Sequence, residues 1–400
     1  MVSPEHSQYL VGNYAPPAIE IVRGQGTKVW DSDGKEYLDF TSGIAVSNLG
    51  HSHPHWVQSL SSQAKELVHC SNLYSIPEQV RLAKRLVEKI GPGKLIFCNS
   101  GAEANEGLLK LARLFGNQSK DSPKTKFVAA ENGFHGRTLG ALSATASPKY
   151  RKGFEPLLPT FSFAPLNDID AFEDAIDAQT CAVLIESIQG EGGIYEAEDS
   201  FLCKLSQICS EKNVLLLLDE VQAGIGRTGE FLGFQKSGIQ PNAVAMAKGL
   251  GGGFPIGAIW ISEEFTKTFG PGSHGTTFGG SPLACSAAHA VLDVLEEENL
   301  ISAARQKGEH LKSELSQFIT KYPNLVSEVR GRGLMLALAF KCDPASLVQK
   351  LRESGLLVVG AGGQAIRFLP PLNVKEGEIE QAMKIVDSSL SNFQPNEAGK

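Results

Sequence analysis

The chain has 400 residues, of which 42% are hydrophobic and 20% are charged, a composition typical of a globular protein with room for two domains. A formal net charge of -7 argues against nucleic-acid partners, and the longest aliphatic run, Val214 to Leu218, is far too short to span a membrane. The seven cysteines are scattered without a Cys-x-x-Cys pair and no signal sequence opens the chain, so we expect a reducing, cytoplasmic location.

The first predicted elements are β-strands, and three alternating histidines follow them. Residues 22–40 are predicted to form a β-meander around the Asp-Gly turn signal at 33–34. His51, His53 and His55 could suggest a metal site. No carboxylate or cysteine accompanies them at ligand spacing, and the proline among them indicates an irregular turn. We therefore expect structural histidines and no metal.

A helix, a short strand and a second helix are predicted over residues 78–114. Apolar residues recur at helical spacing over 78–90 until a Gly-Pro-Gly run, and a strand at 95–98 leads into the second helix. Ser100 is placed to cap that helix, and Gly101 would let a ligand approach its first turn. The start of a helix directly after a strand is a natural phosphate site. Ordinary capping gives the same pattern, so both interpretations stay open at this point.

The next strand, predicted over 126–130, runs into a loop at 132–138 that carries Phe134 and Arg137. An aromatic residue between glycines, three positions before an arginine, can offer a ring face and a fixed cation in one loop. A purely structural loop would have the same composition.

Two near-continuous apolar runs, 182–186 and 214–218, have the pattern of strands buried on both faces of a parallel sheet. Carboxylates stand where these runs end, at Glu186 and Asp219, and Lys248 ends a further apolar stretch. In open α/β sheets ligands bind at the carboxyl edge of the strands. The two carboxylates, the lysine and the serine cap before the helix are therefore expected to meet in one site.

Lys248 follows five small or apolar residues and precedes a glycine-rich stretch. An unpaired ammonium costs several kcal/mol to bury, so a lysine at this place needs a reason. Its stem could pack while its head reaches water. Alternatively, it is a nucleophile, because lysine amines form imines with carbonyl compounds such as pyridoxal phosphate.

The last part of the chain is predicted to form a small α+β unit. A loop rich in glycine and hydroxyl side chains precedes it and opens a helix over 283–297. The further predicted elements are a helix at 301–322, a strand region around a turn at 326–339, a strand pair at 356–359 and 365–369, and a helix at 376–390.

Taken in this order, the pieces resemble the class III pyridoxal-phosphate aminotransferases over residues 13–390. The motifs that carry the resemblance are residues 100–105, 134–138, 189–193 and 218–229, and Lys248 with its glycines. The resemblance implies the fold type I architecture of pyridoxal-phosphate-dependent transferases, an α/β fold. Its large α/β/α domain, with a seven-stranded, mostly parallel sheet, would cover residues 51–288. A small α+β domain would be built from both termini, residues 1–50 and 289–400.

The same resemblance implies roles around pyridoxal 5'-phosphate. Lys248 would hold the cofactor covalently and then move the proton during catalysis, and Asp219 would pair with its ring nitrogen. The remaining cofactor contacts that the resemblance implies are Ser100, Gly101, Ala102, Phe134, His135, Glu186, Val221, Gln222 and Thr277. Thr277 would reach the phosphate of a neighbouring subunit, which implies a homodimer with shared active sites.

Within the family, the chain is most similar to members that transfer the terminal amino group of N2-acetylornithine to 2-oxoglutarate. The substrate contacts implied are Arg137, Glu191, Thr276, Arg367 and Ile44. The two arginines suit the two carboxylates of 2-oxoglutarate and glutamate, and Glu191 would pair with Arg367 while the acylated donor, which has one carboxylate, is bound. The family's ornithine enzymes carry a tyrosine where this chain has Ile44, which favours an acylated donor.

Other functions fit the sequence less well. Succinylornithine, ornithine and 4-aminobutyrate aminotransferases, or an aminomutase, would keep the fold and change the reaction. A nicotinamide-binding oxidoreductase could use the glycines at 249–253, but no strand–glycine–helix unit with a following acid surrounds them. A catalytically silent interaction protein would not be expected to keep both Lys248 and Asp219.

Overall fold

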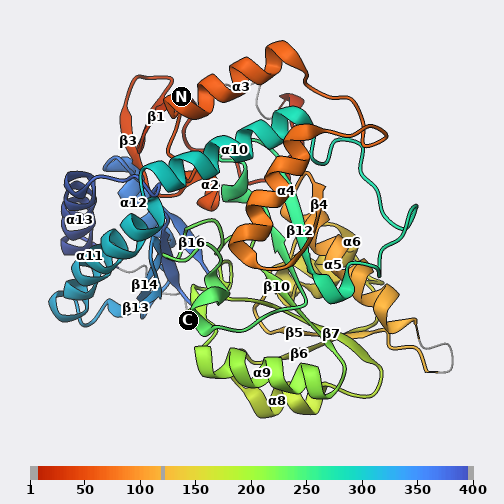
Figure 1. The fold of residues 1–400 in the computed structure, drawn as a ribbon. Coiled ribbons are helices and arrows are strands. Elements are labelled where there is room, and N and C mark those ends of the chain that lie inside the picture. The colour runs from red at the N-terminus through yellow and green to blue at the C-terminus, as the bar shows by residue number, and fades with distance from the viewer. Residues whose placement is uncertain (1–7, 119–121, 395–400) are drawn as a thin grey trace.

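The centre of the protein, in a computed structural model that describes residues 8–118 and 122–394, is a seven-stranded sheet (Figure 1). Its strand order is β4-β12-β11-β10-β7-β5-β6. β12 runs antiparallel to both neighbours, and the pairs among β11, β10, β7, β5 and β6 are parallel, which confirms the predicted mostly parallel sheet. The strands are β4 (Gly93–Cys98), β5 (Lys126–Ala130), β6 (Phe161–Ala164), β7 (Thr180–Glu186), β10 (Leu215–Asp219), β11 (Ala243–Met246) and β12 (Gly257–Ser262).

Helices bury both faces of this sheet, because successive side chains of a strand point to opposite sides. In β10, Leu215 and Leu217 belong to the apolar cluster that includes α5, whereas Leu216 and Leu218 belong to the cluster that includes α8 and α9. The helices of this part of the chain are α3 (Pro54–Glu66), α4 (Pro77–Ile90), α5 (Gly101–Gly116), α6 (Leu139–Ala144), α7 (Pro148–Arg151), α8 (Ile169–Ala175), α9 (Asp199–Glu211) and α10 (Pro282–Glu297).

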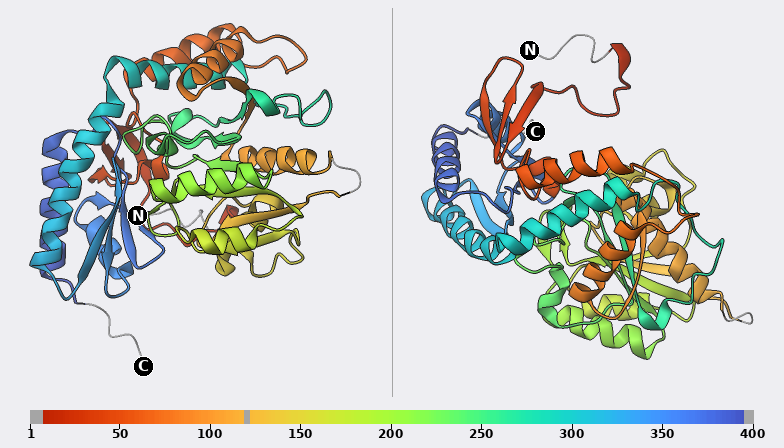
Figure 2. Two further views of the ribbon diagram at one scale, coloured as in Figure 1. Left: turned by 60° about the horizontal axis from the view of Figure 1, so that its bottom comes forward. Right: turned by 45° about the horizontal axis from the view of Figure 1, so that its top comes forward.

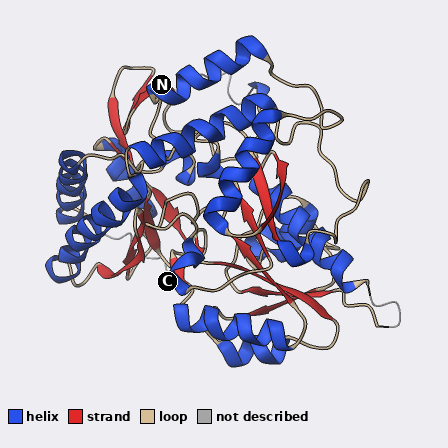
Figure 3. Cartoon of the chain, viewed as in Figure 1, coloured by secondary structure: helices blue, strands red, loops and turns tan. Residues whose placement is uncertain are grey.

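Both ends of the chain contribute to a second group of elements, seen beside the central sheet in Figures 2 and 3. The predicted meander forms β1 (Ile21–Gln25), β2 (Lys28–Asp31) and β3 (Glu36–Asp39). A second sheet, of order β13-β14-β17-β16, comes from the C-terminal part. Its strands are β13 (Val326–Arg332), β14 (Met335–Phe340), β16 (Val359–Ala361) and β17 (Ala365–Phe368), with helices α11 (Leu300–Lys321), α12 (Ala345–Glu353) and α13 (Glu376–Ser391). The division into domains at residues 51 and 288 stays a prediction.

One predicted strand pairing differs from the structure. The stretch 356–359 was expected to pair as a whole with 365–369. Instead it is split, because β15 (Leu356–Leu357) adds in parallel to β3 and only β16 pairs with β17. Short apolar strands carry no information about which distant edge they join, and this pairing ties the two chain ends into one unit.

A buried arginine joins this unit to the central part. Arg227 donates hydrogen bonds to the Asn48 side chain and to the carbonyl groups of Leu334 and Pro370, and it lies fully inside the protein. Burial, without a carboxylate partner among the described residues, lowers the pKa of Arg227 to about 9. Three segments far apart in the sequence thus depend on one side chain.

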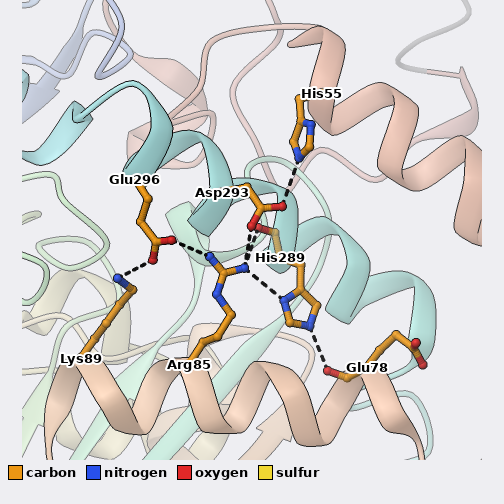
Figure 4. A network of polar contacts seen from close by, with 7 residues as sticks. All are labelled: His55, Glu78, Arg85, Lys89, His289, Asp293 and Glu296. Atoms are coloured by element: carbon orange, nitrogen blue, oxygen red, sulfur yellow. Dashed lines mark hydrogen bonds and ion pairs between the residues drawn. The ribbon is translucent and has the colours of Figure 1, made fainter.

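Figure 4 shows a polar network that holds α3, α4 and α10 together. Arg85 of α4 pairs with Asp293 and Glu296 of α10 at 2.7 and 3.0 Å, and His55 of α3 hydrogen-bonds to Asp293 at 3.1 Å. The other two of the three alternating histidines bond to different carboxylates, His51 to Asp39 and His53 to Glu298. The three rings therefore do not converge on one point.

The remaining short elements lie in the connections. They are α2 (Ser42–Ala45), β8 (Ile188–Gln189), β9 (Tyr195–Glu196), η1 (Gly233–Ser237), η2 (Lys248–Leu250) and η3 (Glu263–Phe265). Across residues 8–118 and 122–394, no helix combines the length and the apolar character that crossing a membrane requires.

Candidate active site

The carboxyl ends of β7, β10, β4 and β11 surround a cavity of about 600 Å³. Asp219 and Glu186 stand side by side in register at the ends of neighbouring parallel strands. The sequence-predicted residues that line the cavity are Ser100, Gly101, Ala102, Phe134, His135, Arg137, Glu186, Asp219, Val221, Gln222 and Lys248. Strand-end residues separated by helical segments in the sequence are thus brought together, as the topology of a parallel sheet requires.

Asp219 is held by three hydrogen bonds. Its Oδ2 accepts from Asn105 Nδ2 at 2.7 Å and is 2.8 Å from His135 Nδ1, and its Oδ1 accepts from the Val221 N–H at 3.0 Å. Burial opposes a charge on His135, but the hydrogen bond to Asp219 and its charge outweigh burial and raise the pKa of this imidazole. The carboxylate is therefore fixed in orientation and supported by a hydrogen-bond donor on each oxygen.

Glu186 connects two loops of the site. It accepts hydrogen bonds from the N–H groups of Phe134 and Gly190 at 2.9 and 3.0 Å. Burial raises the pKa of Glu186 to about 7. The charge of His135 acts against this shift, and the charge of Asp219 acts in the same direction as burial. These two hydrogen bonds orient the loop that carries Phe134 relative to the loop that carries Glu191.

The N-terminus of α5 opens into the cavity. Ser100 caps the helix by accepting from the Glu103 N–H at 3.1 Å, so the predicted cap is confirmed. Within the described part of the chain, the N–H groups of Gly101 and Ala102 have no hydrogen-bond partner. A Cβ atom on Gly101 would lie 2.6 Å from a methyl group of Val221, so only glycine fits there. Free N–H groups at the positive end of a long helix form an anion site.

Lys248 stands just past the end of β11, at the start of η2, with a left-handed φ of 43°. Its ammonium has no hydrogen bond or ion pair to any residue within 8–118 and 122–394. Burial lowers the pKa of Lys248 to about 8, with the charge of Glu191 opposing the shift. A lysine in this state supplies a neutral amine near physiological pH, as a nucleophile or proton carrier must.

Arg367 and Glu191 form a bidentate ion pair at the edge of this site. The two Nη–Oε distances are 2.6 and 3.1 Å, and Arg367 also donates to Gln222 Oε1 at 3.2 Å. The Arg367 side chain is only 1% exposed and that of Glu191 21%, so this is not a solvated surface pair. Burial opposes ionisation of Glu191, but Arg367 outweighs it and holds the pKa of this carboxyl below its usual value.

Five predicted site residues do not line the cavity: Glu191 and Arg367, which pair at its edge, and Thr276, Thr277 and Ile44. Thr276 accepts a hydrogen bond from Asn99 Nδ2 at 3.1 Å and lines a separate cavity, and the adjacent Thr277 is exposed to solvent. Ile44 is 37% exposed in α2 with a left-handed φ of 66°, and Val46 lines the site in its vicinity.

Sequence reasoning missed two contributors. Asn105 lies on the buried face of α5 and donates to both Asp219 and the His135 carbonyl. A buried amide on an apolar helix face was the signal, since such a group needs partners. Tyr150 on α7 packs against Phe134 and Arg137, and nothing in its local sequence indicated this.

The chain is similar in sequence to known aminotransferases. Residues 10–390 match the family described as aminotransferase class-III. The acetylornithine aminotransferase of Caldanaerobacter subterraneus is 46% identical over 387 residues, covering 96% of this chain and 98% of the relative. That of Aquifex aeolicus is 48% identical over 383 residues, covering 96% and 100%.

The chain also superposes on solved structures of aminotransferases. The ornithine aminotransferase from Toxoplasma gondii, described with pyridoxal phosphate partially occupying its active site, superposes with a TM-score of 0.92 at 33% identity, covering 96% of this chain and 92% of that one. The acetylornithine aminotransferase from Elizabethkingia anophelis superposes with a TM-score of 0.86 at 34% identity, covering 97% of each chain.

Proposed function

Because the chain belongs to the class III aminotransferases, we propose that it moves the terminal amino group of N2-acetylornithine to 2-oxoglutarate. The products are N-acetylglutamate 5-semialdehyde and glutamate, and this conversion serves arginine biosynthesis. Near full-length identity of 42–48% to acetylornithine aminotransferases supports this reaction. The unpaired state of all seven cysteines supports a cytoplasmic location.

The family's cofactor, pyridoxal 5'-phosphate, suits the groups around the cavity. The free N–H groups of Gly101 and Ala102 fit its phosphate, and the Asp219 carboxylate fits a protonated ring nitrogen. When bound, the cofactor supplies an electron-withdrawing ring to the reacting carbon. His135 Nδ1 lies 2.8 Å from Asp219 Oδ2 and supports its charge, whereas the buried Nε2 of the same ring has no partner among the described residues.

Each residue of the site then has a proposed task. Lys248 would hold the cofactor through its amine and would then move a proton at the reacting carbon. Phe134 would cover a face of the cofactor ring, and Gln222 would donate to its ring oxygen. The supporting contacts come from Ser100, His135, Glu186 and Val221, which orient Gly101, Asp219 and Phe134.

The observation that carries the choice of substrate is the closed Arg367–Glu191 pair, together with Arg137, which has no ion pair among the described residues. A dicarboxylate such as 2-oxoglutarate or glutamate requires both guanidinium groups, and a donor with one carboxylate requires one. Glu191 neutralises Arg367 when the acylated donor is bound and withdraws for the dicarboxylate. Ile44 and Thr276 are proposed to contact the donor at the entrance, where an apolar Ile44 suits an acylated amine.

The substrate assignment predicts faster turnover of N2-acetylornithine than of ornithine. With 2-oxoglutarate as acceptor, we expect kcat/KM for the acetylated donor to be about 10-fold higher or more, because a free α-ammonium would be unpaired in the site. Glutamate formation measured with each donor, and with N2-succinylornithine and 4-aminobutyrate, checks this. A higher kcat/KM for ornithine would contradict the proposed donor and indicate a different class III activity.

We also propose a homodimer whose sites combine residues of both chains. The loop with Thr277 carries Phe278, which is 63% exposed and packs against His69 at 5.3 Å between ring centres. Leu73 and Tyr74 nearby are 86% and 70% exposed. Large exposed apolar side chains on two joined loops suit an interface with a second copy, where Thr277 would reach the partner's cofactor phosphate.

Shared sites predict complementation between two damaged chains. In a hybrid of a Lys248→Ala chain and a Thr277→Ala chain, one site receives an intact lysine and an intact threonine, and the other receives neither. We expect hybrids isolated by two different affinity tags to recover up to about half of the unaltered activity at limiting cofactor concentration. Activity equal to the mean of the two parents would show that each chain completes its own site.

A further inference from the structure

The two arginines of the site are held in different ways. Arg367 is paired with a carboxylate, whereas the guanidinium carbon of Arg137 lies 4.1 Å from the ring centre of Tyr150 and 5.6 Å from that of Phe134. The two rings meet edge to face, with centres 5.5 Å apart and planes at 78°. Within the described residues, Arg137 has no ion pair.

An aromatic face orients a guanidinium without neutralising it. A carboxylate partner would compete with the substrate for the N–H donors of Arg137, whereas a ring attracts the cation through its quadrupole and leaves the in-plane donors free. A guanidinium stacked in this manner keeps its full charge for an incoming carboxylate. Arg137 is therefore available at all times, and Arg367 only when Glu191 withdraws.

The surroundings restrain the same arginine from its backbone side. Glu106 of α5 accepts hydrogen bonds from the Thr138 hydroxyl and from the N–H groups of Gly140 and Ala141 at 3.0 and 3.1 Å, which fixes the chain next to Arg137. Tyr150 is supplied from α7, where Pro148 begins the short helix and the Tyr150 N–H donates to the Ser147 carbonyl at 3.1 Å. Backbone and side chain of Arg137 are thus set by separate elements.

We propose that Tyr150 is a positioning residue for substrate binding, which keeps the Arg137 guanidinium aimed at the carboxylate that every substrate of this enzyme carries. This rests on the proposed function for the identity of the substrates. The ring, and not the hydroxyl, performs the task, because the Tyr150 hydroxyl makes no hydrogen bond to the described residues. Its removal should weaken both half-reactions alike, in contrast to a change at Glu191.

The test uses the holoenzyme in single-turnover half-reactions with N2-acetylornithine and, separately, with glutamate. For Tyr150→Leu we expect the apparent Kd of both substrates to rise roughly 2- to 5-fold, the range of a cation–π contact to an exposed arginine, with limiting rates changed less than about 2-fold. Tyr150→Phe keeps the ring and should stay close to the unaltered enzyme. Lys152→Ala, an exposed change next to the same helix, serves as the control for damage to α7.

Several outcomes would overturn the proposal. They are an equal loss in Tyr150→Phe, an unchanged Kd in Tyr150→Leu, or a loss confined to one of the two substrates. If Tyr150→Leu does not fold, Tyr150→Met, which keeps apolar bulk without a ring face, replaces it, and the cofactor absorbance spectrum reports whether the site is intact. If the unaltered enzyme ignores N2-acetylornithine but reacts with glutamate, the proposed donor is wrong while the glutamate arm still tests Tyr150.

Discussion

Replacing Lys248 with alanine is expected to lower the rate of transamination by roughly 10³- to 10⁴-fold, because the variant loses the group that carries the proton. Among the described residues no other lysine lines the cavity, so no neighbour there is placed to take over. The pKa of about 8 means that the native amine is neutral in a substantial fraction of molecules at physiological pH. The measurement is glutamate formation from N2-acetylornithine and 2-oxoglutarate at saturating cofactor.

A chemical label separates loss of this amine from loss of the fold. Borohydride reduction of the unaltered holoenzyme should fix a pyridoxyl group on the peptide that contains Lys248, as seen by mass spectrometry. Lys267→Ala, which removes an exposed lysine farther along the chain, should keep both the activity and the label. A label on another lysine would refute the central assignment of the site.

Replacing Glu191 with glutamine is expected to slow the N2-acetylornithine half-reaction by about 10- to 100-fold and to leave the glutamate half-reaction unchanged or faster. Glutamine cannot neutralise Arg367, whose side chain is almost fully buried. With the acylated donor bound, a bare guanidinium would face the uncharged end of the substrate. With glutamate bound, the second carboxylate pairs with Arg367 and no longer has to displace Glu191.

The two half-reactions are followed separately by single-turnover spectroscopy of the bound cofactor. Glu196→Gln is a matched control, because Glu196 lies in the same small hairpin and also faces an arginine. The distance between Glu196 Oε2 and Arg332 Nε is 3.6 Å. That control should retain both half-reactions. Equal losses in both halves for Glu191→Gln would mean that the Arg367 pair is a static structural contact.

Together with the Tyr150 variants, this experiment distinguishes two ways of handling a carboxylate. Glu191 adjusts the charge of one arginine between substrates, and its loss should affect one half-reaction. Tyr150 leaves the charge of the other arginine unchanged, and its loss should affect both. A double variant of Tyr150→Leu and Glu191→Gln should show nearly additive effects on binding, since no contact joins the two residues.

Much of the fold was readable from local patterns. The apolar runs before Glu186 and Asp219 predicted strands covered on both faces, and β7 and β10 are entirely buried. Helical periodicity placed α4, α10, α11 and α13 within about two residues of their ends. These features are local because hydrophobic period and capping act over a few neighbouring residues.

The candidate site was predictable to the extent that it is built from strand ends. Lys248, Asp219, Glu186 and the helix start at Ser100 converge because parallel strands share a carboxyl edge, which holds for any sheet of this kind. The roles of these residues came from the family resemblance, and they remain proposals to be tested by the variants above.

The amino-acid sequence by itself determined the strands, the helices, the capped helix start and the lysine at a strand end, since each depends on side chains close together along the chain. Only the tertiary structure decided that Asn105 and His135 hold Asp219, that Tyr150 holds Arg137, and that β15 joins β3. Each of these contacts links segments that the sequence separates, and nothing in either segment alone specifies its partner. Burial decided the rest, because enclosure within the fold is what lowers the pKa of Lys248 and makes the Arg367–Glu191 pair more than a solvated surface contact.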